Sequence, residues 1–204
     1  MYKSYIKRPL DLVVSTFLLL ILSPLLFIIA VIIKFTSKGP VIYKGVRSGL
    51  HNEQFEIFKF RTMIEDAELK GGGTTALNDP RIIPFGNFLR KYKLDELPQL
   101  INVFLSQMSL VGPRPELPFY TKNYSSDEKR ILTILPGITD LSSVRFSSLD
   151  EIVGEKNADE EFEKIVLKEK NYLRLQYVDN VSFSLDIKII IMTFTCIIKK
   201  LFKT

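Results

Sequence analysis

The sequence predicts a mostly helical α/β protein with one small β-hairpin, preceded by a hydrophobic segment that lies in a membrane. Three observations support this fold class: a nearly uninterrupted apolar run at residues 12–33, short alternating apolar stretches at 41–50 and 54–63, and helical spacing of apolar residues further along the chain. The length of 204 residues suits one domain of ordinary size. We therefore expect residues 1–36 in the membrane and residues 37–204 as one compact domain.

The composition limits the possible partners and chemistry. A net charge of +5 with 46% hydrophobic residues suits a protein on an anionic membrane surface at least as well as a nucleic-acid-binding protein. We expect no nucleic-acid partner, because the basic residues flank apolar segments instead of forming a recognition helix. Cys196 and His51 are the only residues of their types, which excludes an intramolecular disulfide and multi-histidine metal sites.

The N-terminal hydrophobic segment has nearly the roughly 20 residues that a membrane-spanning helix needs. Ser23-Pro24 lies at its middle, where proline removes one helical hydrogen bond and predicts a kink. Both flanks are basic, so the positive-inside rule does not select one orientation. This pattern favours a re-entrant helix that enters and leaves on the same face, and a kinked single-pass anchor remains the alternative.

The segments that follow predict a hairpin and several helices. The stretches VIYKGVRSGL and QFEIFKFRTM predict its two strands. We expect short helices at Glu65–Lys70 and Phe85–Arg90, and a longer one at Glu96–Phe104. Because proline is tolerated only in the first turn of a helix, Pro98 places the start of this longer helix near Asp95.

The second half of the chain predicts a stiff segment and further helices. Pro113 and Pro115 flank Arg114 and should hold it in one place. We expect helices at Ser126–Leu135 and Glu151–Leu175, with a turn at Pro136-Gly137.

A final amphipathic helix is predicted at about residues 183–202, with lysines near its end. Its apolar side carries Ile187, Ile190, Ile191, Phe194, Ile198 and Leu201. The apolar run is too short to span a membrane, so this helix is expected to lie in the headgroup plane or to pack on the domain.

Asp95 and Glu96 form the candidate catalytic pair. Free N–H groups at a helix start stabilise anions, which favours Asp95 as an ionised nucleophile beside a bound phosphate. Adjacent helical side chains diverge by about 100°, so one carboxylate can attack while the other holds Mg²⁺ or positions a proton. Mg²⁺ bridges carboxylates and diphosphate oxygens, and Arg114 can fork onto phosphate. Helix capping alone is the non-catalytic alternative.

An ordered series of short motifs accompanies this pair. It comprises Lys7-Arg8, Asp11, Ser23-Pro24, Gly39-Pro40, Arg47 with Gly49, FKFRTM at 58–63, Asp79-Pro80-Arg81, Phe85-Gly86, Leu89-Arg90, DELPQLINV, MSLVGPRP and Pro136-Gly137-Ile138-Thr139. Along nearly the whole chain the series resembles the monotopic phosphoglycosyl transferases, also called the bacterial sugar transferase family, in their small single-domain form.

The resemblance implies a fold, a location and a reaction. The helix of residues 1–36 would break at Ser23-Pro24, and residues 37–204 would form a catalytic domain on the cytoplasmic face of the bacterial inner membrane, aided by amphipathic helices lying on the lipid bilayer. In a ping-pong reaction, Asp95 would attack the β-phosphate of a UDP-sugar and release UMP. Undecaprenyl (polyprenyl) phosphate would then take the sugar phosphate. Glu96 would assist with Mg²⁺, both carboxylates serving the metal, and Arg114 would bind a phosphate.

The sequence leaves open what three basic residues bind: Lys59, Arg61 and Arg145. Lys59 and Arg61 belong to a matching motif, and either substrate phosphate or lipid headgroups would suit them. After Thr139, many relatives continue with Ala-Gln-Val-Asn-Gly-Arg, whereas this chain reads DLSSVRF at 140–146. We expect Arg145 to take the role of the usual arginine, and the difference leaves the sugar and nucleotide specificity open.

Two other function classes fit less well. A glycosyltransferase that moves sugar without phosphate is expected to carry an acidic DxD motif, and the sequence has none. A membrane scaffold with a degenerate site would not need Asp95, Glu96 and Arg114 together.

Overall fold

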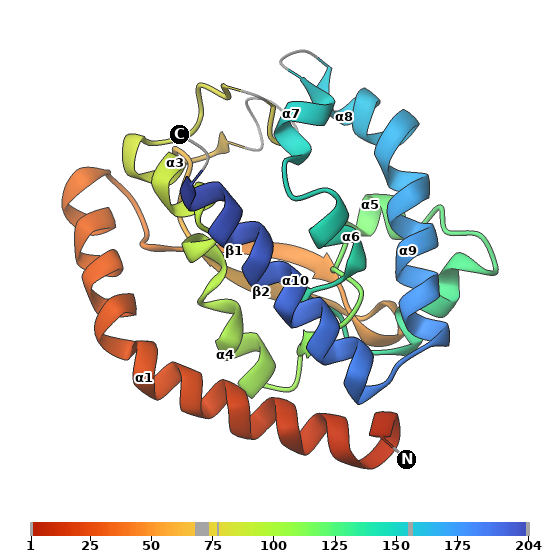
Figure 1. The fold of residues 1–204 in the computed structure, drawn as a ribbon. Coiled ribbons are helices and arrows are strands. Elements are labelled where there is room, and N and C mark those ends of the chain that lie inside the picture. The colour runs from red at the N-terminus through yellow and green to blue at the C-terminus, as the bar shows by residue number, and fades with distance from the viewer. Residues whose placement is uncertain (1, 68–73, 77, 155–156, 203–204) are drawn as a thin grey trace.

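The computed structural model describes residues 2–67, 74–76, 78–154 and 157–202. A short π-helix, η1 (Tyr2–Ile6), leads into the long helix α1 (Lys7–Thr36), which runs along one side of the molecule and bends partway along its length (Figure 1). The helix is apolar and long enough to cross a membrane, and only 11% of its most apolar 18-residue window is buried. It is therefore not a core helix of the domain.

Helix α1 contains Pro24, whose missing N–H leaves the carbonyl of Leu20 without its usual helical partner. The Ser23 hydroxyl donates to this oxygen at 2.8 Å. The serine thus replaces the hydrogen bond that the proline removes. The side chains around the bend are apolar and exposed, with Leu20 and Phe27 each 70% exposed.

The predicted hairpin is confirmed. Strands β1 (Ile42–Ser48) and β2 (Gln54–Phe60) pair antiparallel with Ile42 opposite Phe60. The turn η2 (Leu50–Asn52) joins them, and His51 lies in this turn with a φ of 53°. Ile57 and Phe60 of β2 are buried in two of the hydrophobic clusters.

A second sheet was not predicted. Strands β3 (Ser109–Val111) and β4 (Gly137–Thr139) form a parallel pair. The prediction of a turn at Pro136-Gly137 is therefore wrong, because Gly137 is the first residue of β4. The two strands approach so closely that a Cβ on Gly137 would lie 2.1 Å from the Gly112 nitrogen, and this tertiary contact overrides the local turn signal.

The helix at Phe85–Arg90 is confirmed as α3 (Pro84–Lys91), whereas the start of the next helix differs from the prediction. Helix α4 (Gln99–Phe104) begins at Gln99, and Asp95 lies in the preceding 3₁₀ turn η3 (Leu94–Glu96). Lys93 has a φ of 58°, so the chain turns sharply there and enters η3 through i→i−3 bonds.

Of the remaining predicted helices, one is shorter than predicted and one is broken into several pieces. The segment 126–135 contains the 3₁₀ helix η4 (Glu128–Thr133), and 151–175 divides into α7 (Leu149–Val153), α8 (Ala158–Glu161), the π-helix η5 (Phe162–Val166) and α9 (Leu167–Asp179). Gly154 and Asn157, both with positive φ, end the first piece and begin the second. Half of the helix predicted at Glu65–Lys70 lies outside the described residues, and in the other half Glu65 and Asp66 form a turn and only Ala67 is helical.

The C-terminal helix agrees with its predicted range. Helix α10 (Phe183–Phe202) lies across the front of the molecule in Figure 1, and α5 (Pro118–Thr121) and α6 (Leu141–Arg145) complete the fold. The exposed apolar side chains of α10 recur at helical spacing. They are Phe183, Ile187, Ile191, Phe194, Ile198 and Phe202.

Asp186 connects α10 to two other parts of the chain. Its carboxylate accepts hydrogen bonds from the Tyr2 hydroxyl at 2.6 Å, from Lys7 Nζ at 2.5 Å and from the Tyr177 hydroxyl at 2.6 Å. The beginning of α1, the end of α9 and the start of α10 therefore meet at one buried side chain.

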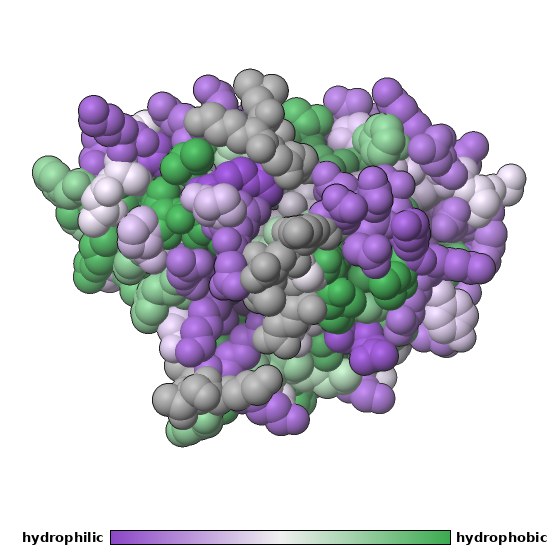
Figure 2. Space-filling model, turned by 90° about the horizontal axis from the view of Figure 1, so that it is seen from above, coloured by the Kyte–Doolittle hydropathy of each residue, from purple (hydrophilic) through white to green (hydrophobic). Residues whose placement is uncertain are grey.

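The face at the top of Figure 1 differs from the sides formed by α1 and α10. Figure 2 shows mainly hydrophilic side chains over this face, with hydrophobic ones in smaller groups between them. This distribution is typical of a surface in contact with water.

Candidate active site

The candidate site is assembled from three segments that are distant in sequence. The turn η3 supplies Asp95 and Glu96, the end of β2 supplies Lys59, and the chain after β3 supplies Arg114. These side chains gather around a single carboxylate, that of Glu96.

Glu96 is bound by three cations through one oxygen. Its Oε1 lies 2.5 Å from Arg114 Nη2, 3.3 Å from Lys59 Nζ and 4.0 Å from Lys93 Nζ. Burial alone would raise the pKa of Glu96, but the charges of Arg114, Lys59 and Lys93 outweigh it and hold the pKa below its ordinary value. Glu96 is therefore ionised, and it neutralises a basic cluster.

Asp95 has a different environment from its neighbour. It is only 6% exposed, and its Oδ1 is buried without a hydrogen-bond partner. Burial and the charge of Glu96 raise the pKa of Asp95, while Lys59 and Lys93 oppose the rise. Burial and the charge of Glu96 thus act against the helix start, which favours the ionised form. Asp95 is thus the carboxyl group of the pair that other side chains leave free.

Lys59 completes the charge balance of the site. Burial lowers the pKa of its ammonium to about 8, although the neighbouring Glu96 favours the charged form. A lysine with such a lowered pKa binds an anion well only when a nearby negative charge keeps its amine protonated. The carboxylate of Glu96 supplies that charge.

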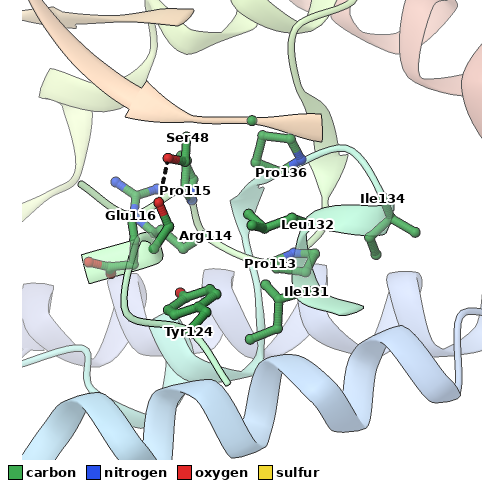
Figure 3. Close-up of a pocket in the computed structure, with 12 residues that line it drawn as sticks. Ser48, Pro113, Arg114, Pro115, Glu116, Tyr124, Ile131, Leu132, Ile134 and Pro136 are labelled. Atoms are coloured by element: carbon green, nitrogen blue, oxygen red, sulfur yellow. Dashed lines mark hydrogen bonds between the residues drawn. The ribbon is translucent and has the colours of Figure 1, made fainter. Parts of the chain in front are cut away.

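Arg114 is held by the parallel strands and the prolines around it. Its Nη1 donates to the Ile138 carbonyl at 2.6 Å, and its backbone N–H donates to Asp140 Oδ2 at 3.1 Å. Figure 3 shows Pro113 and Pro115 on either side of Arg114, along the wall of a small pocket that Ser48 and Tyr124 also line. The prediction that this segment is extended and fixes Arg114 agrees with this arrangement.

A buried ion network supports the same segment from behind. Arg174 of α9 is fully buried, with its Nη2 2.8 Å from Glu116 Oε1 and its Nε 3.7 Å from Asp140 Oδ2. Asp140 also accepts a hydrogen bond from the Ser143 N–H and caps α6. The first residue of the atypical segment 140–146 is therefore structural and lies directly behind Arg114.

The structure separates the other predicted basic residues from this cluster. Arg61 is buried and donates to the Lys38 carbonyl, to the Ser37 carbonyl at 2.9 Å and to Ser37 Oγ at 2.7 Å, so it fastens the end of α1. Arg145 is exposed and pairs with Glu169 at 3.2 Å. Neither has a contact with Glu96 in the part of the chain that the structure describes.

Sequence reasoning missed Lys93, Gln99, Asp140 and Arg174. Of these four, only Gln99 could have been proposed from the sequence. It lies four residues after Asp95 and therefore on the same side of the helical segment. Its side chain is fully buried, and neither end of its amide has a hydrogen-bond partner. The others depend on contacts between segments remote in sequence.

A magnesium ion is implied by the resemblance, and the carboxylates offer limited support for it. No cluster of three or more His, Cys, Asp or Glu side chains occurs among the described residues. Mg²⁺ is commonly held by one or two carboxylates together with substrate phosphates, so a full protein cage is not required. The carboxyl group of Asp95, which no ion pair holds, and a Glu96 whose three cations all contact Oε1 fit such a site.

Comparisons with known proteins show what the chain is similar to. The family model described as bacterial sugar transferase matches residues 2–200. An undecaprenyl-phosphate glucose phosphotransferase of Komagataeibacter xylinus is 38% identical over 194 residues, covering 92% of this chain and 35% of that protein. The uncharacterized sugar transferase EpsL of Bacillus subtilis (strain 168) is 36% identical over 188 residues, covering 92% of this chain and 85% of that protein.

A third relative names a different sugar. The UDP-N-acetylgalactosamine-undecaprenyl-phosphate N-acetylgalactosaminephosphotransferase of Aeromonas hydrophila is 32% identical over 206 residues, covering 96% of this chain and 44% of that protein. The chain thus spans less than half the length of these transferases of Komagataeibacter xylinus and Aeromonas hydrophila.

Proposed function

The chain belongs to the bacterial sugar transferase family, and on this premise we propose that it moves a sugar 1-phosphate from a UDP-sugar to a polyprenyl phosphate such as undecaprenyl phosphate. The names of the relatives from Komagataeibacter xylinus and Aeromonas hydrophila support the acceptor. They name two different sugars, so the sugar that this chain transfers stays open.

The observation that carries the mechanism is the contrast between the two carboxyl groups. Glu96 is bound by three cations, whereas no ion pair or side-chain hydrogen bond among the described residues holds the carboxyl group of Asp95. A nucleophile must have a free oxygen, and an anchored carboxylate cannot leave its partners without exposing their charges. We therefore assign the nucleophile to Asp95 and the positioning of the cations to Glu96.

The proposed reaction has two displacements at one phosphorus. A carboxylate oxygen of Asp95 attacks the β-phosphorus of the UDP-sugar, the bond from that phosphorus to the bridging oxygen breaks, and UMP leaves with the electron pair. A phosphate oxygen of the polyprenyl phosphate then attacks the same phosphorus. The bond to Asp95 breaks, which regenerates the carboxylate and gives the polyprenyl-diphosphate sugar.

The basic residues serve the phosphate groups in this scheme. Arg114 presents two donors in a fixed fork, and Lys59 adds a point charge on the same side of Glu96. An arriving diphosphate takes over part of their hydrogen bonding from Glu96. Magnesium, held by Asp95 and Glu96, would offset the charge of the diphosphate.

We also propose that α1 enters the membrane and returns to the face it came from. Near its start, Arg8 donates to the Val103 carbonyl at 2.7 Å and Asp11 accepts from Ser109 Oγ at 2.6 Å. Near its end, Ile29 and Ile33 are buried against the same domain. A helix that docks at both ends and exposes an apolar bend between them suits a re-entrant position at the inner membrane.

The reaction is tested by UMP release from a panel of UDP-sugars. The protein is solubilised in detergent with Mg²⁺ and undecaprenyl phosphate, and Asp95→Asn serves as the control. We expect UMP with at least one sugar and none from Asp95→Asn. Release of UDP would contradict the proposal, since it would mean transfer of sugar without phosphate.

The membrane position is tested by cysteine labelling from one side of sealed vesicles. In a Cys196→Ser background, single variants Lys3→Cys and Lys38→Cys place a thiol before and after α1. A re-entrant helix makes both thiols reactive from the same side. Reaction from opposite sides would establish a single span.

A further inference from the structure

Gln99 is a buried polar residue for which the structure supplies no bonding partner. Its side chain is 0% exposed, and both its Nε2 and its Oε1 lack hydrogen bonds. Burying an amide without partners is costly, and native proteins rarely retain one unless a further state of the molecule uses it. Asp95 Oδ1, four residues earlier, is a buried acceptor in the same condition.

The local backbone directs Gln99 toward Asp95. Residues four apart in a helical segment lie one turn above each other, and helical side chains lean toward the N-terminus. Leu97 and Pro98 both have right-handed helical backbone angles and join η3 to α4 without a break. The amide of Gln99, at the first residue of α4, therefore leans toward the turn that holds Asp95.

Asn102 shows what the same face of α4 contacts one turn further on. Its Oδ1 accepts from the Phe58 N–H at 2.9 Å, and its Nδ2 donates to the Glu56 carbonyl at 2.7 Å. Both partners belong to β2, whose next residue after Phe58 is Lys59. The side-chain amide of Asn102 thus has hydrogen-bond partners in the hairpin. The amide of Gln99, one turn closer to the candidate site, has none.

Burial distinguishes a role toward Asp95 from a role toward substrate. Asp95 retains a small exposure of 6%, whereas Gln99 has none and does not meet solvent. A substrate phosphate meets Asp95 first. The inward oxygen of Asp95, Oδ1, is the unpaired acceptor to which Gln99 can donate.

We propose that Gln99 is a positioning residue for the nucleophile: in the reacting state its Nε2 donates to Asp95 Oδ1 and turns Oδ2 toward the phosphorus. This inference rests on the function proposed above for Asp95. This bond satisfies two of the three unpaired atoms. A fixed carboxylate reacts faster than one that rotates freely, because its orientation is already set.

The test uses Gln99→Met, which keeps the length of the side chain and removes both polar ends. UMP release is followed in the steady state with detergent-solubilised protein, UDP-glucose or the donor that the sugar panel selects, Mg²⁺ and undecaprenyl phosphate. We expect the rate to fall about ten- to a hundredfold, as for the loss of a hydrogen bond to a charged group. The KM for the donor should change by less than about twofold, because Gln99 does not touch it.

Thermal stability separates this role from a structural one. An apolar side chain of similar shape removes unpaired buried atoms, so Gln99→Met should melt at the same temperature as the parent protein or higher. Gln99→Asn keeps the amide but shortens its reach by one methylene, and it should also be slow. The matched control Asn102→Ala should melt lower, with its rate per folded molecule nearly unchanged.

The outcomes distinguish this inference from the function on which it rests. An unchanged rate in Gln99→Met, or a rate that falls together with the melting temperature, would overturn the role of Gln99 alone, provided that Asp95→Asn is inactive. UMP release from Asp95→Asn would overturn the assigned nucleophile and this inference with it. Slow turnover at an unchanged KM and an unreduced melting temperature would establish it.

Discussion

Replacing Arg114 by lysine tests whether the fork of the guanidinium, and not only its charge, holds the site together. Arg114 makes two bonds in different directions, to Glu96 Oε1 at 2.5 Å and to the Ile138 carbonyl at 2.6 Å. A lysine has one ammonium and a different reach, so it can keep only one of these contacts. The variant retains the charge and loses the geometry.

The size of the effect follows from the contact that is lost. A hydrogen bond involving a charged group contributes about 1.5–3 kcal/mol to stability. For a chain of this length, each kcal/mol lowers the melting temperature by about 2–4 °C, which gives a decrease of about 3–12 °C. The rate of UMP release should fall at least about tenfold, because the remaining bond cannot orient the phosphate.

Arg145→Lys is the matched control. Arg145 has a side chain that is 66% exposed and makes one surface pair with Glu169 at 3.2 Å. Surface pairs of this kind contribute about 0–1 kcal/mol, so the melting temperature and the rate should hardly change. Both variants are measured by thermal melting in detergent and by UMP release. Equal behaviour of the two variants would refute the reasoning about the fork, and a large loss of rate in Arg145→Lys would place that residue at the substrate.

Three other changes give further checks. Arg61→Met should lower the melting temperature while UMP release per folded molecule persists, because Arg61 fastens the end of α1 and does not touch Glu96; an unchanged melting temperature would contradict this role. Burial lowers the pKa of Lys170 to about 8 from an ordinary 10.5, so below pH 8 both the folded and unfolded states carry the proton and the cost of burying it is fully present. Lys170→Met should therefore stabilise the fold at pH 7 by about 1–3 kcal/mol, with the gain disappearing toward pH 10.5; thermal melts that show the same gain at pH 7 and pH 10 would rule this out. Ser23→Ala combined with Pro24→Ala should straighten α1 and move one of the two labelled flanks to the opposite side of the vesicle, and labelling that stays on one side would show that the bend does not depend on this pair.

Local sequence signals were sufficient for much of the fold. The alternating stretches gave the hairpin β1–β2, and the spacing of apolar residues gave α3 and the range of α10. These elements depend on their own residues and on immediate neighbours. The parallel pair β3–β4 could not be read in this way, because each strand has three residues and its partner lies more than 25 positions away.

The candidate site also combines features that the local sequence predicts with features that depend on contacts between distant segments. Asp95, Glu96 and Arg114 could be proposed from their types and spacing, and the resemblance suggested Lys59. That Glu96 is bound by three cations follows from where β2 and the segment after β3 come to lie, which no local pattern specifies. The start of α4 was misplaced for a related reason, since the positive φ of Lys93 shifts Asp95 into a 3₁₀ turn.

The meeting of Tyr2, Lys7 and Tyr177 at Asp186 has a consequence for the order in which the chain is made. Asp186 is synthesised 184 residues after Tyr2 and 179 residues after Lys7. While the ribosome is still adding the intervening residues, α1 already exists as an apolar helix without this anchor. It must therefore find lipid or a chaperone first, and it reaches its final place on the domain only after Asp186 has been synthesised.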